Sequence, residues 1–362
     1  MASSVRAVLS RPLMASLHRL LVPPRSRLSL LTTARLLSLS HAAIEQNVSV
    51  SPQTADTVLM VAPKYFNLNL ATATDNIYQT LPDQLKGASS DQIVGLATKE
   101  FEGLVSLLRG NGVRVLVVEP LEEHKDCTDA VFPNNWVSFH EGKIALYPMM
   151  AENRRRERRM DVVESLCREL RADIVDYSPW ENQGMFLEGT GSMVLDRTNR
   201  LCYACLSQRT HPEVLVGFCR DFGYTPVAFE ATQLAEDGKL RPVYHTNVIC
   251  SVGDGFVVLC TELIREAGQR KMVLDTIRSS NKELVDIDEE QVFNFAGNIL
   301  QLSGPGGERL LVMSSAAYES FRSDQLASLR RHVDVILHVP LPTIESLGGG
   351  GARCMLGEVF TH

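Results

Sequence analysis

Apolar residues follow a helical spacing in five stretches of the chain, and a short apolar run typical of a strand comes directly after each stretch. This alternation of helix and strand predicts an α/β protein. The predicted helices cover residues 91–112, 160–170, 212–223, 261–280 and 315–332. The predicted strands cover residues 113–119, 173–177, 225–229, 284–288 and 334–339.

A second pattern follows the helix–strand pairs. It consists of a polar or small residue, a strand, a tight turn and another strand, which is typical of a β-hairpin. It occurs in residues 134–148, 189–207, 245–260 and 296–314, and residues 350–360 repeat its first half. Its equivalent positions, Asn135, Gly191, Asn247, Asn298 and Arg353, are 56, 56, 51 and 55 residues apart. A spacing this regular indicates an internal repeat.

The incomplete last repeat predicts how the two ends of the folded region meet. Residues 350–360 lack the second strand of a hairpin, and residues 58–63 (VLMVAP) form a strand pattern without a partner. Pairing these two segments would close a ring and remove its free edge. We therefore expect a five-bladed α/β propeller with pseudo-fivefold symmetry, built as a single closed domain over residues 50–362. Two independent domains are the weaker alternative, because no linker rich in Pro, Gly or Ser divides the chain.

The first 43 residues differ in composition from the rest of the chain. They hold six arginines and eight serines but no Asp or Glu. That composition is typical of a mitochondrial transit peptide, whereas a secretory signal would need an apolar run that no arginine interrupts. We expect residues 1–43 to be a transit peptide, with a disordered basic tail as the alternative, and the remainder to work in the mitochondrial matrix. The sequence leaves the cleavage site open.

The net charge of the chain after residue 43 limits the kinds of binding partner that we expect. All 43 acidic residues lie there with 30 of the 36 basic residues, so the net charge of this part is near −13. Such an acidic body argues against a nucleic-acid partner, and no apolar run reaches the ~18 residues of a membrane span. The basic run RRRERR at residues 154–159 is predicted to be a solvated helix face. The sequence leaves the formation of a homo-oligomer open.

The cysteines and glycines do not form the usual metal or cofactor motifs. Cys202 and Cys205 make a single CxxC motif inside a predicted strand, where positions three apart face opposite sides. No second pair accompanies them, so we predict two buried thiols and no zinc site. The glycine tract at residues 348–351 lacks the spacing of a dinucleotide-binding fingerprint. We expect no metal and no cofactor.

The predicted ring would place the junction before each hairpin at one mouth of a central channel. Residues at these junctions are far apart in the sequence but would converge in space. A thiol, an imidazole, carboxylates and amides around one pocket form a set suited to nucleophilic catalysis. The glycines at 348–351 would let the backbone pass close to a substrate at φ values that other residues avoid. The converging residues are Asp129, Asn135, Glu188, His245, Asn247, Asn298 and Cys354.

Four motifs in order resemble the guanidino-group-modifying, or pentein, superfamily: FPNN (132–135), EGTG (188–191), HTN (245–247) and a terminal GGGxxxC (348–354). The superfamily includes arginine deiminases, agmatine deiminases, dimethylarginine dimethylaminohydrolases and glycine amidinotransferases. The fullest match is to the citrulline-utilisation hydrolase branch, through residues 58–69, 129–140 and 351–360. The resemblance covers nearly everything after the leader.

The resemblance implies a small amino-acid substrate and a reaction without metal or cofactor. It implies that Cys354 attacks the central carbon of a guanidino or ureido group. It further implies that His245 protonates the leaving group and then activates water, while Glu188 holds the planar nitrogens of the substrate. The candidate substrate-binding residues are Asp129, Asn135, Asn247, Gly350, Arg353 and Asn76.

Two positions depart from the arginine deiminase pattern, which has Asp where this chain has Asn135 and Asn247. A guanidinium cation prefers carboxylates, whereas a neutral ureido group needs donors and acceptors together, and Asn supplies both. We therefore hypothesise a ureido substrate, with citrulline first. Asp129 could restore one charge, which keeps arginine and methylated arginines open. An amidinotransferase on the same fold and a non-enzymatic binding scaffold are the alternatives.

Overall fold

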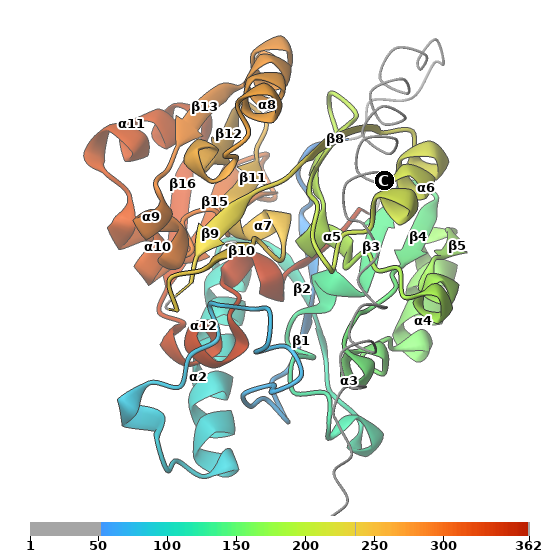
Figure 1. Ribbon diagram of the computed structural model, residues 1–362. Helices are drawn as coiled ribbons and strands as arrows, with labels where there is room; N and C mark the ends of the chain where they lie inside the picture. Colours follow the sequence, from blue (N-terminus) through green and yellow to red (C-terminus); the bar gives the residue numbers. More distant parts are fainter. Residues whose placement is uncertain (1–51, 236, 361–362) are drawn as a thin grey trace, which may run out of the picture. The chain divides into compact units, whose positions relative to one another are not determined.

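Five three-stranded sheets and one two-stranded sheet contain the strands of the described residues, 52–235 and 237–360 of a computed structural model (Figure 1). In each three-stranded sheet the central strand pairs antiparallel with one neighbour and parallel with the other. In sheet order the strands are β17 (Gly357–Val359), β1 (Thr57–Val61) and β2 (Arg114–Val118); β3 (Val137–His140), β4 (Lys143–Leu146) and β5 (Asp173–Asp176); β6 (Val194–Asp196), β7 (Leu201–Cys205) and β8 (Thr225–Phe229); β11 (Cys250–Val252), β12 (Phe256–Leu259) and β13 (Glu283–Asp286); and β14 (Leu300–Ser303), β15 (Arg309–Ser314) and β16 (Val335–Val339).

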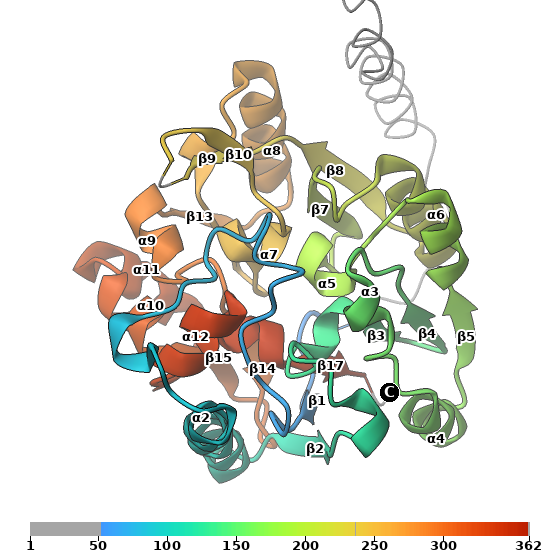
Figure 2. The same cartoon turned by 60° about the horizontal axis from the view of Figure 1, so that its bottom comes forward.

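Helices connect the central strand of each sheet to its parallel neighbour, because parallel strands need a crossover connection. These helices are α2 (Ser90–Gly110), α4 (Met160–Leu170), α6 (Pro212–Phe222), α8 (Ala267–Ser279), and the pair α10 (Ser315–Ser320) and α11 (Ser323–His332). Figure 2 shows α2, α4, α6, α8 and α11 on the outside, with the sheets following one another around the middle of the domain. Local signals set their ends: α2 starts at a capping box of Ser89 and Gln92, and α6 ends at Gly223 with a φ of 70°.

The helix and strand pattern predicted from the sequence is confirmed for these elements, with two differences. The stretch 315–332 forms two helices, because Phe321 adopts an extended backbone and a new helix begins after Arg322, whose backbone N–H donates to Oε1 of Gln325 at 2.9 Å. The stretch 261–280 becomes a regular helix only at Ala267, where the side chain of Glu266 accepts hydrogen bonds from the first free N–H groups.

The first and last strands of the described residues lie side by side, as the sequence predicted. β1 pairs antiparallel with β17, and Leu59 lies opposite Gly357. β1 also pairs in parallel with β2, so it is the central strand of its sheet and all five of its residues are buried. This pairing fixes the segment that carries Cys354 to the start of the domain.

Short helical turns stand where the sequence analysis expected strands to begin. Four of them come directly before the strands β3, β6, β11 and β17, and they were missed because a turn of three or four residues shows no periodicity. They are η3 (Pro133–Asn135), α5 (Gly189–Ser192), α7 (Thr246–Ile249) and η6 (Ala352–Met355). Most of the candidate site residues lie on or directly before these turns, but Asn76 and Asp129 do not.

Other elements were not predicted from the sequence. A hairpin of β9 (Thr232–Leu234) and β10 (Leu240–Pro242) follows β8, and α12 (Pro342–Gly348) leads into the glycine tract. The remaining short helices are η1 (Asp83–Leu85), η2 (Glu122–His124), α3 (Glu152–Arg155), η4 (Ser178–Gln183), η5 (Thr261–Leu263) and α9 (Glu289–Phe293).

The two cysteines of the CxxC motif are buried on opposite faces of β7, as predicted. Cys202 packs in the apolar cluster under α6, and Cys205 packs in the cluster around β12. In the part of the chain that the structure describes, no three His, Cys, Asp or Glu side chains gather as a metal site would require. None of the described helices is both long and apolar enough to cross a bilayer.

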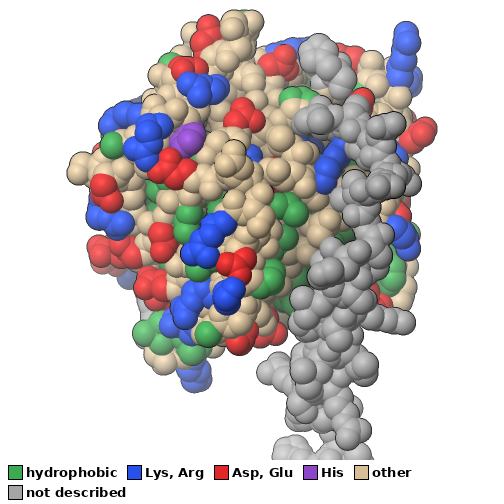
Figure 3. All heavy atoms as spheres, turned by 90° about the horizontal axis from the view of Figure 1, so that it is seen from above, with side chains coloured by type: hydrophobic (Ala, Val, Ile, Leu, Met, Phe, Trp, Pro, Cys, Tyr) green, Lys and Arg blue, Asp and Glu red, His purple; other side chains and the backbone are tan. Residues whose placement is uncertain are grey.

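Acidic and basic side chains are mixed over the face seen in Figure 3. The described residues belong to one compact unit. The predicted transit peptide, residues 1–43, lies outside the described residues.

Candidate functional site

A narrow cavity gathers side chains from all along the domain. Six of the predicted site residues line it: Asn76, Asp129, Asn135, His245, Gly350 and Cys354. Phe132, Arg154, Arg209, Tyr244 and Gly348 complete the wall. Each of the titratable side chains in this wall is at least nine-tenths buried. The predicted convergence of thiol, imidazole and carboxylate at one place is therefore present in the structure.

Two carboxamide groups surround the sulfur of Cys354. The Nδ2 atoms of Asn247 and Asn298 lie 3.5 Å and 3.2 Å from Sγ, and both can donate to it. Asn298 also accepts from the backbone N–H of Cys354 at 3.3 Å and donates to the carbonyl of Asn247 at 2.9 Å. Burial raises the pKa of the Cys354 thiol, while the hydrogen bonds from Asn298 and Asn247 and the charge of Arg353 oppose that rise. The amides thus favour the thiolate once it forms.

Crowding by neighbouring side chains explains why glycine occupies positions 348–351 better than a need for unusual backbone conformations does. Among them only Gly349 has a positive φ, at 63°, which corrects the expectation that the whole tract uses unusual conformations. A Cβ on Gly348 would meet the Phe132 ring at 2.6 Å, and one on Gly349 would meet the Asn76 amide at 2.5 Å. A Cβ on Gly350 would lie 3.1 Å from the Cβ and 3.2 Å from the Sγ of Cys354.

Replacing Gly350 with alanine is expected to reduce catalysis more than stability. The added methyl group would press on Cys354 and on the ring of Phe132, and a displaced nucleophile costs roughly 10- to 100-fold in kcat/KM. Steady-state kinetics and thermal unfolding would measure the two effects. Gly357→Ala is the matched control, because its nearest contact would be an ordinary 3.5 Å. Equal losses in both variants would contradict the prediction.

Glu188 and His245 form a hydrogen-bonded pair, with 2.8 Å between Oε2 and Nε2. Burial alone would raise the pKa of Glu188, but Arg209 and His245 hold that pKa far below its usual range. Burial lowers the pKa of His245, although Glu188 opposes this. An ionised carboxylate only accepts hydrogen bonds, so Nε2 of His245 carries the proton and Nδ1 keeps its lone pair. A neutral imidazole beside the cavity can therefore act as a base.

Glu188 itself does not line the cavity, which differs from the role implied by the sequence. Its Oε1 accepts from the backbone N–H of Met150 at 2.9 Å, and its Oε2 also faces Nη1 of Arg209 at 3.4 Å. With both oxygens engaged, the carboxylate is placed to orient His245 rather than to hold the nitrogens of a substrate.

Two buried arginines in the wall were not among the predicted site residues. Arg154 makes a bidentate pair with Glu157 at 2.9 Å and 3.0 Å, and Arg209 donates to Asp75 through Nε at 2.8 Å. The prediction of a solvated helix face for residues 154–159 is wrong for Arg154, Glu157 and Arg159, which are at most 9% exposed. The basic run alone does not show which of its arginines is buried. The acidic residue three positions after Arg154 is the one sequence signal that could have identified Arg154 as half of a buried ion pair.

Three polar atoms at the site have no hydrogen-bond partner among the described residues: Oδ1 of Asp129, Nδ2 of Asn135 and Oδ1 of Asn247. Asp129 is otherwise held through its Oδ2, which accepts from Asn69 at 2.8 Å and from Thr72 at 3.1 Å. Buried polar groups are rarely left unpaired, so these atoms are places where a ligand could bind.

Arg353 and Asn76 have other contacts than those expected. The guanidinium of Arg353 donates to the carbonyl of Leu356 at 2.8 Å and to Glu358 at 2.9 Å, and it does not line the cavity. Asn76 does line it, but its amide also faces the carbonyl groups of Gly348 and Gly349 at 3.4 Å and 3.5 Å. Arg353 thus lies beside β17 and stabilises this segment instead of contacting the cavity.

Comparison with solved structures shows the same fold in three proteins of known structure. The N-terminal domain of ArgZ, described as an arginine dihydrolase from the ornithine–ammonia cycle in cyanobacteria, has a TM-score of 0.62 at 15% identity, over 84% of this chain and 97% of that one. AgrE, solved with L-arginine, has a TM-score of 0.62 at 17% identity, over 84% of this chain and 40% of its own. DDAH from Pseudomonas aeruginosa, solved with citrulline, has a TM-score of 0.56 at 13% identity, over 84% and 99%.

A search of curated protein sequences found no match. The family model for eukaryotic N,N dimethylarginine dimethylhydrolase matches residues 62–361, which is most of the chain. The predicted resemblance to the guanidino-group-modifying superfamily is confirmed. The chain belongs to the eukaryotic N,N dimethylarginine dimethylhydrolase family.

Proposed function

We propose that this protein is a cysteine-dependent hydrolase that cleaves a C–N bond in the ureido or guanidino group of a citrulline- or arginine-like amino acid. The observation that carries the proposal is the cavity in which Cys354 Sγ lies beside two amide donors, with His245 in the same wall and Glu188 hydrogen-bonded to it from behind. Cysteine is the nucleophile, His245 the acid and base, and Glu188 the residue that positions His245.

The resting protonation states define the first step. Both Cys354 and His245 are neutral at pH 7, since burial raises the pKa of the thiol and lowers the pKa of the imidazole. His245 and Cys354 share no hydrogen bond among the described residues, so we propose that the proton of Sγ reaches the free Nδ1 of His245 once substrate binds. The resulting thiolate is stabilised by the amides of Asn247 and Asn298. The ionised Glu188 then stabilises the imidazolium.

The remaining steps return the enzyme to its starting state. Sγ bonds to the central carbon, the tetrahedral adduct collapses, and His245 gives its proton to the departing nitrogen as the C–N bond breaks. Water then attacks the carbon bound to sulfur and gives a proton to His245. The C–S bond breaks, the sulfur leaves as a thiolate, and the proton on His245 returns to it.

The two arginines of the wall suit the amino-acid end of a substrate. Arg154 and Arg209 are buried beside the cavity, and arginine is the side chain that best matches a carboxylate. Asp129, with an unpaired Oδ1, suits an ammonium group or a nitrogen of the reacting group. These contacts would fix one end of the substrate while Cys354 attacks the other.

The unpaired atoms favour a ureido group over a guanidinium group. Nδ2 of Asn135 needs an acceptor, whereas Oδ1 of Asn247 needs a donor. A ureido group offers a carbonyl oxygen and N–H groups together, but a guanidinium ion offers N–H groups alone. Citrulline is therefore our first candidate substrate.

Purified protein is expected to release ammonia from citrulline with a kcat/KM at least about tenfold higher than from arginine. Arginine would leave one polar atom of the site unpaired, and one such unpaired contact lowers kcat/KM by about this factor. An ammonia assay on both amino acids under the same conditions would measure this ratio. Trapping a covalent adduct on the Cys354 peptide by mass spectrometry would test the reaction class separately. A preference for arginine would overturn the ureido assignment but not the hydrolase.

Hydrolysis of methylated arginine is the second candidate, and the family match favours it. Asp129 could supply the negative charge that Asn135 and Asn247 do not. Release of methylamine or dimethylamine from methylated arginines, measured beside ammonia from citrulline, would separate the two candidates.

The reactivity of Cys354 is expected to rise with pH to a midpoint above the ordinary value of a thiol. Its pKa is raised by burial, so the thiolate fraction increases only as the pH passes that higher value. Iodoacetamide labelling followed by peptide mass spectrometry would give the profile, and Asn298→Ala should move the midpoint higher. A midpoint well below the ordinary thiol value would show instead a resting thiolate–imidazolium pair.

We also propose that the five three-stranded sheets of the described residues form a closed five-bladed propeller and that the protein works in the mitochondrial matrix. The shared strand order and the β1–β17 pairing support closure. The composition of residues 1–43 supports the location. Imaging a full-length fluorescent fusion beside one that lacks residues 1–43 would test the location.

A further inference from the structure

A second and larger pocket lies beside the catalytic cavity. It has a volume of ≈ 790 Å³, within the range of roughly 300–1,000 Å³ that is usual for small-molecule sites. Asn76 lines both spaces, and the rest of the segment up to Leu81 forms one wall of the larger pocket. The other walls come from the β9–β10 hairpin, the end of α9, and the helices α10 and α12.

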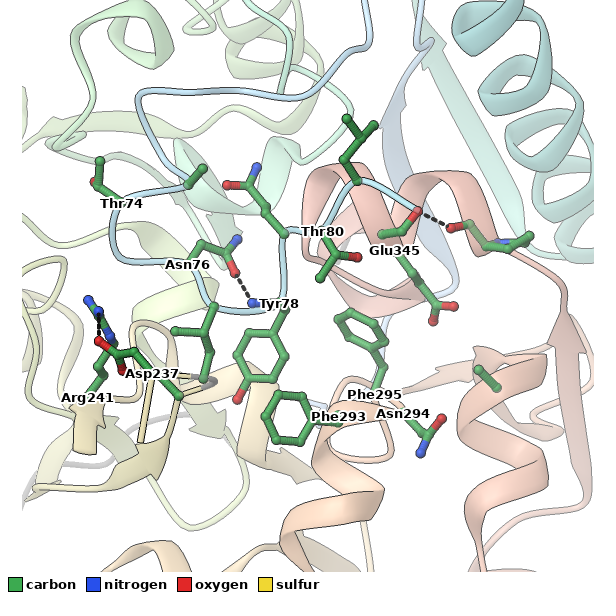
Figure 4. A pocket seen from close by; sticks show the side chains of 18 residues that line it. Thr74, Asn76, Tyr78, Thr80, Asp237, Arg241, Phe293, Asn294, Phe295 and Glu345 are labelled. Carbon is green, nitrogen blue, oxygen red and sulfur yellow. Dashed lines mark hydrogen bonds and ion pairs between the residues drawn. The ribbon is translucent and has the colours of Figure 1, made fainter. Parts of the chain in front are cut away.

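Three aromatic rings lie together in this pocket. Figure 4 shows Tyr78, Phe293 and Phe295 as neighbours. The Tyr78 ring centroid lies 5.5 Å from that of Phe293 and 6.0 Å from that of Phe295. Phe293 is 44% exposed, whereas Tyr78 and Phe295 are 5% and 6% exposed. Phe293 therefore offers most of the aromatic surface that a ligand in this pocket could contact.

Glu345 supplies the charged group of the pocket. Figure 4 shows its carboxyl group beside Phe295. The residue is 6% exposed, and its Oε1 has no hydrogen-bond partner among the described residues. The one cation among the described residues of the wall, Arg241, already donates to Asp237 at 2.9 Å. An ionised Glu345 would therefore be a buried charge without a counterion.

The surroundings of Glu345 show that its charge is not compensated within the domain. Burial and the nearby charge of Glu100 raise the pKa of Glu345 to about 8, although a hydrogen bond with Ser314 acts to lower this pKa. Burying an unpaired carboxylate is unfavourable, so a cation that enters the pocket would gain the full interaction with this group.

We propose that this pocket binds a small organic cation, an alkylguanidinium or alkylammonium ion. Its charged head contacts Glu345, and its alkyl part lies against Phe293 and Phe295. Aromatic faces attract cations through their quadrupole, and a carboxylate beside them adds a charge-assisted hydrogen bond. Glu345 does not line the catalytic cavity, so the site is separate from that of the proposed reaction.

Isothermal titration of the full-length protein with n-butylguanidinium tests the proposal. We expect millimolar or tighter binding to the wild type, and binding weakened at least about tenfold in Glu345→Gln, which keeps the side-chain size but removes the charge. Pentanamide, a neutral probe of similar length, should bind at least tenfold more weakly than the cation. Glu319→Gln, at an exposed glutamate outside the pocket, is the matched control and should bind as the wild type does.

Ala316→Trp gives an independent readout, because Ala316 lines the pocket and a larger side chain there would fill it. We expect this variant to lose the binding that Glu345→Gln weakens, with an unchanged far-ultraviolet circular dichroism spectrum. No binding to the wild type would overturn the proposal. Equal binding to the wild type and Glu345→Gln, or to the cation and pentanamide, would overturn it as well.

Discussion

Replacing Cys354 with serine is expected to lower kcat/KM by roughly 10⁴-fold or more, the range seen when a catalytic nucleophile is removed. A serine hydroxyl has a far higher pKa than a thiol, so the neutral His245 would rarely deprotonate it. The amides of Asn247 and Asn298 would bind the hydroxyl without activating it. Ammonia release from citrulline, with methylated arginines in parallel, would measure the loss.

Cys127→Ser is the control for this substitution. Cys127 is as buried as Cys354, and its Sγ donates to the carbonyl of Asn153 at 3.3 Å, a contact that a hydroxyl can replace. The control should keep wild-type activity and unfold at a similar temperature. A Cys354→Ser protein with more than about 1% of wild-type activity would rule out a covalent sulfur intermediate.

Glu188→Gln is expected to lower kcat by roughly 10³- to 10⁴-fold through the tautomer of His245. Glutamine has one acceptor oxygen, whereas Glu188 accepts from Met150 on one side and from His245 and Arg209 on the other. If the oxygen faces Met150, the amide N–H₂ faces Nε2 of His245 and moves the imidazole proton to Nδ1. The nitrogen that acts as the base in the proposed reaction then has no lone pair.

Glu181→Gln is the matched control for loss of a partly buried acceptor. Glu181 accepts from the backbone N–H of Met149 at 2.7 Å and pairs with Arg158 at 2.6 Å, but it lies outside the cavity. Both variants should lose stability, and only Glu188→Gln should lose kcat with a changed pH profile. A similar kcat in both would show that Glu188 acts only in stability.

The sequence predicted the repeating parts of this structure because they follow simple periodicities. Apolar spacing predicted the helices on the outside of the sheets and the hairpins. The missing second strand of the last hairpin predicted the pairing of β1 with β17. Cys354, His245 and Asn135 could be assigned to one cavity because each belongs to a repeated junction. The segments that repeat in the sequence form sheets with the same strand order in the structure.

Residues outside the repeat could not be assigned in this way. Arg209 lines the cavity and pairs with Asp75, a contact between distant segments that no local pattern reveals, whereas the partner of Arg154 is Glu157, only three positions away. Asn298 was noted as a repeat position, but its contact with Sγ depends on a side-chain direction. α12 was missed because its seven residues are too few to show helical spacing.

The pairing of β1 with β17 also has a consequence for how the enzyme matures. The turn that carries Cys354 leads directly into β17, so the nucleophile gains its final position only when strands from opposite ends of the domain meet. Contacts this distant in sequence form slowly because loop closure is entropically costly. Catalytic competence should consequently appear late during refolding, after helix content has recovered, and until then the sulfur is open to oxidants that the finished fold excludes.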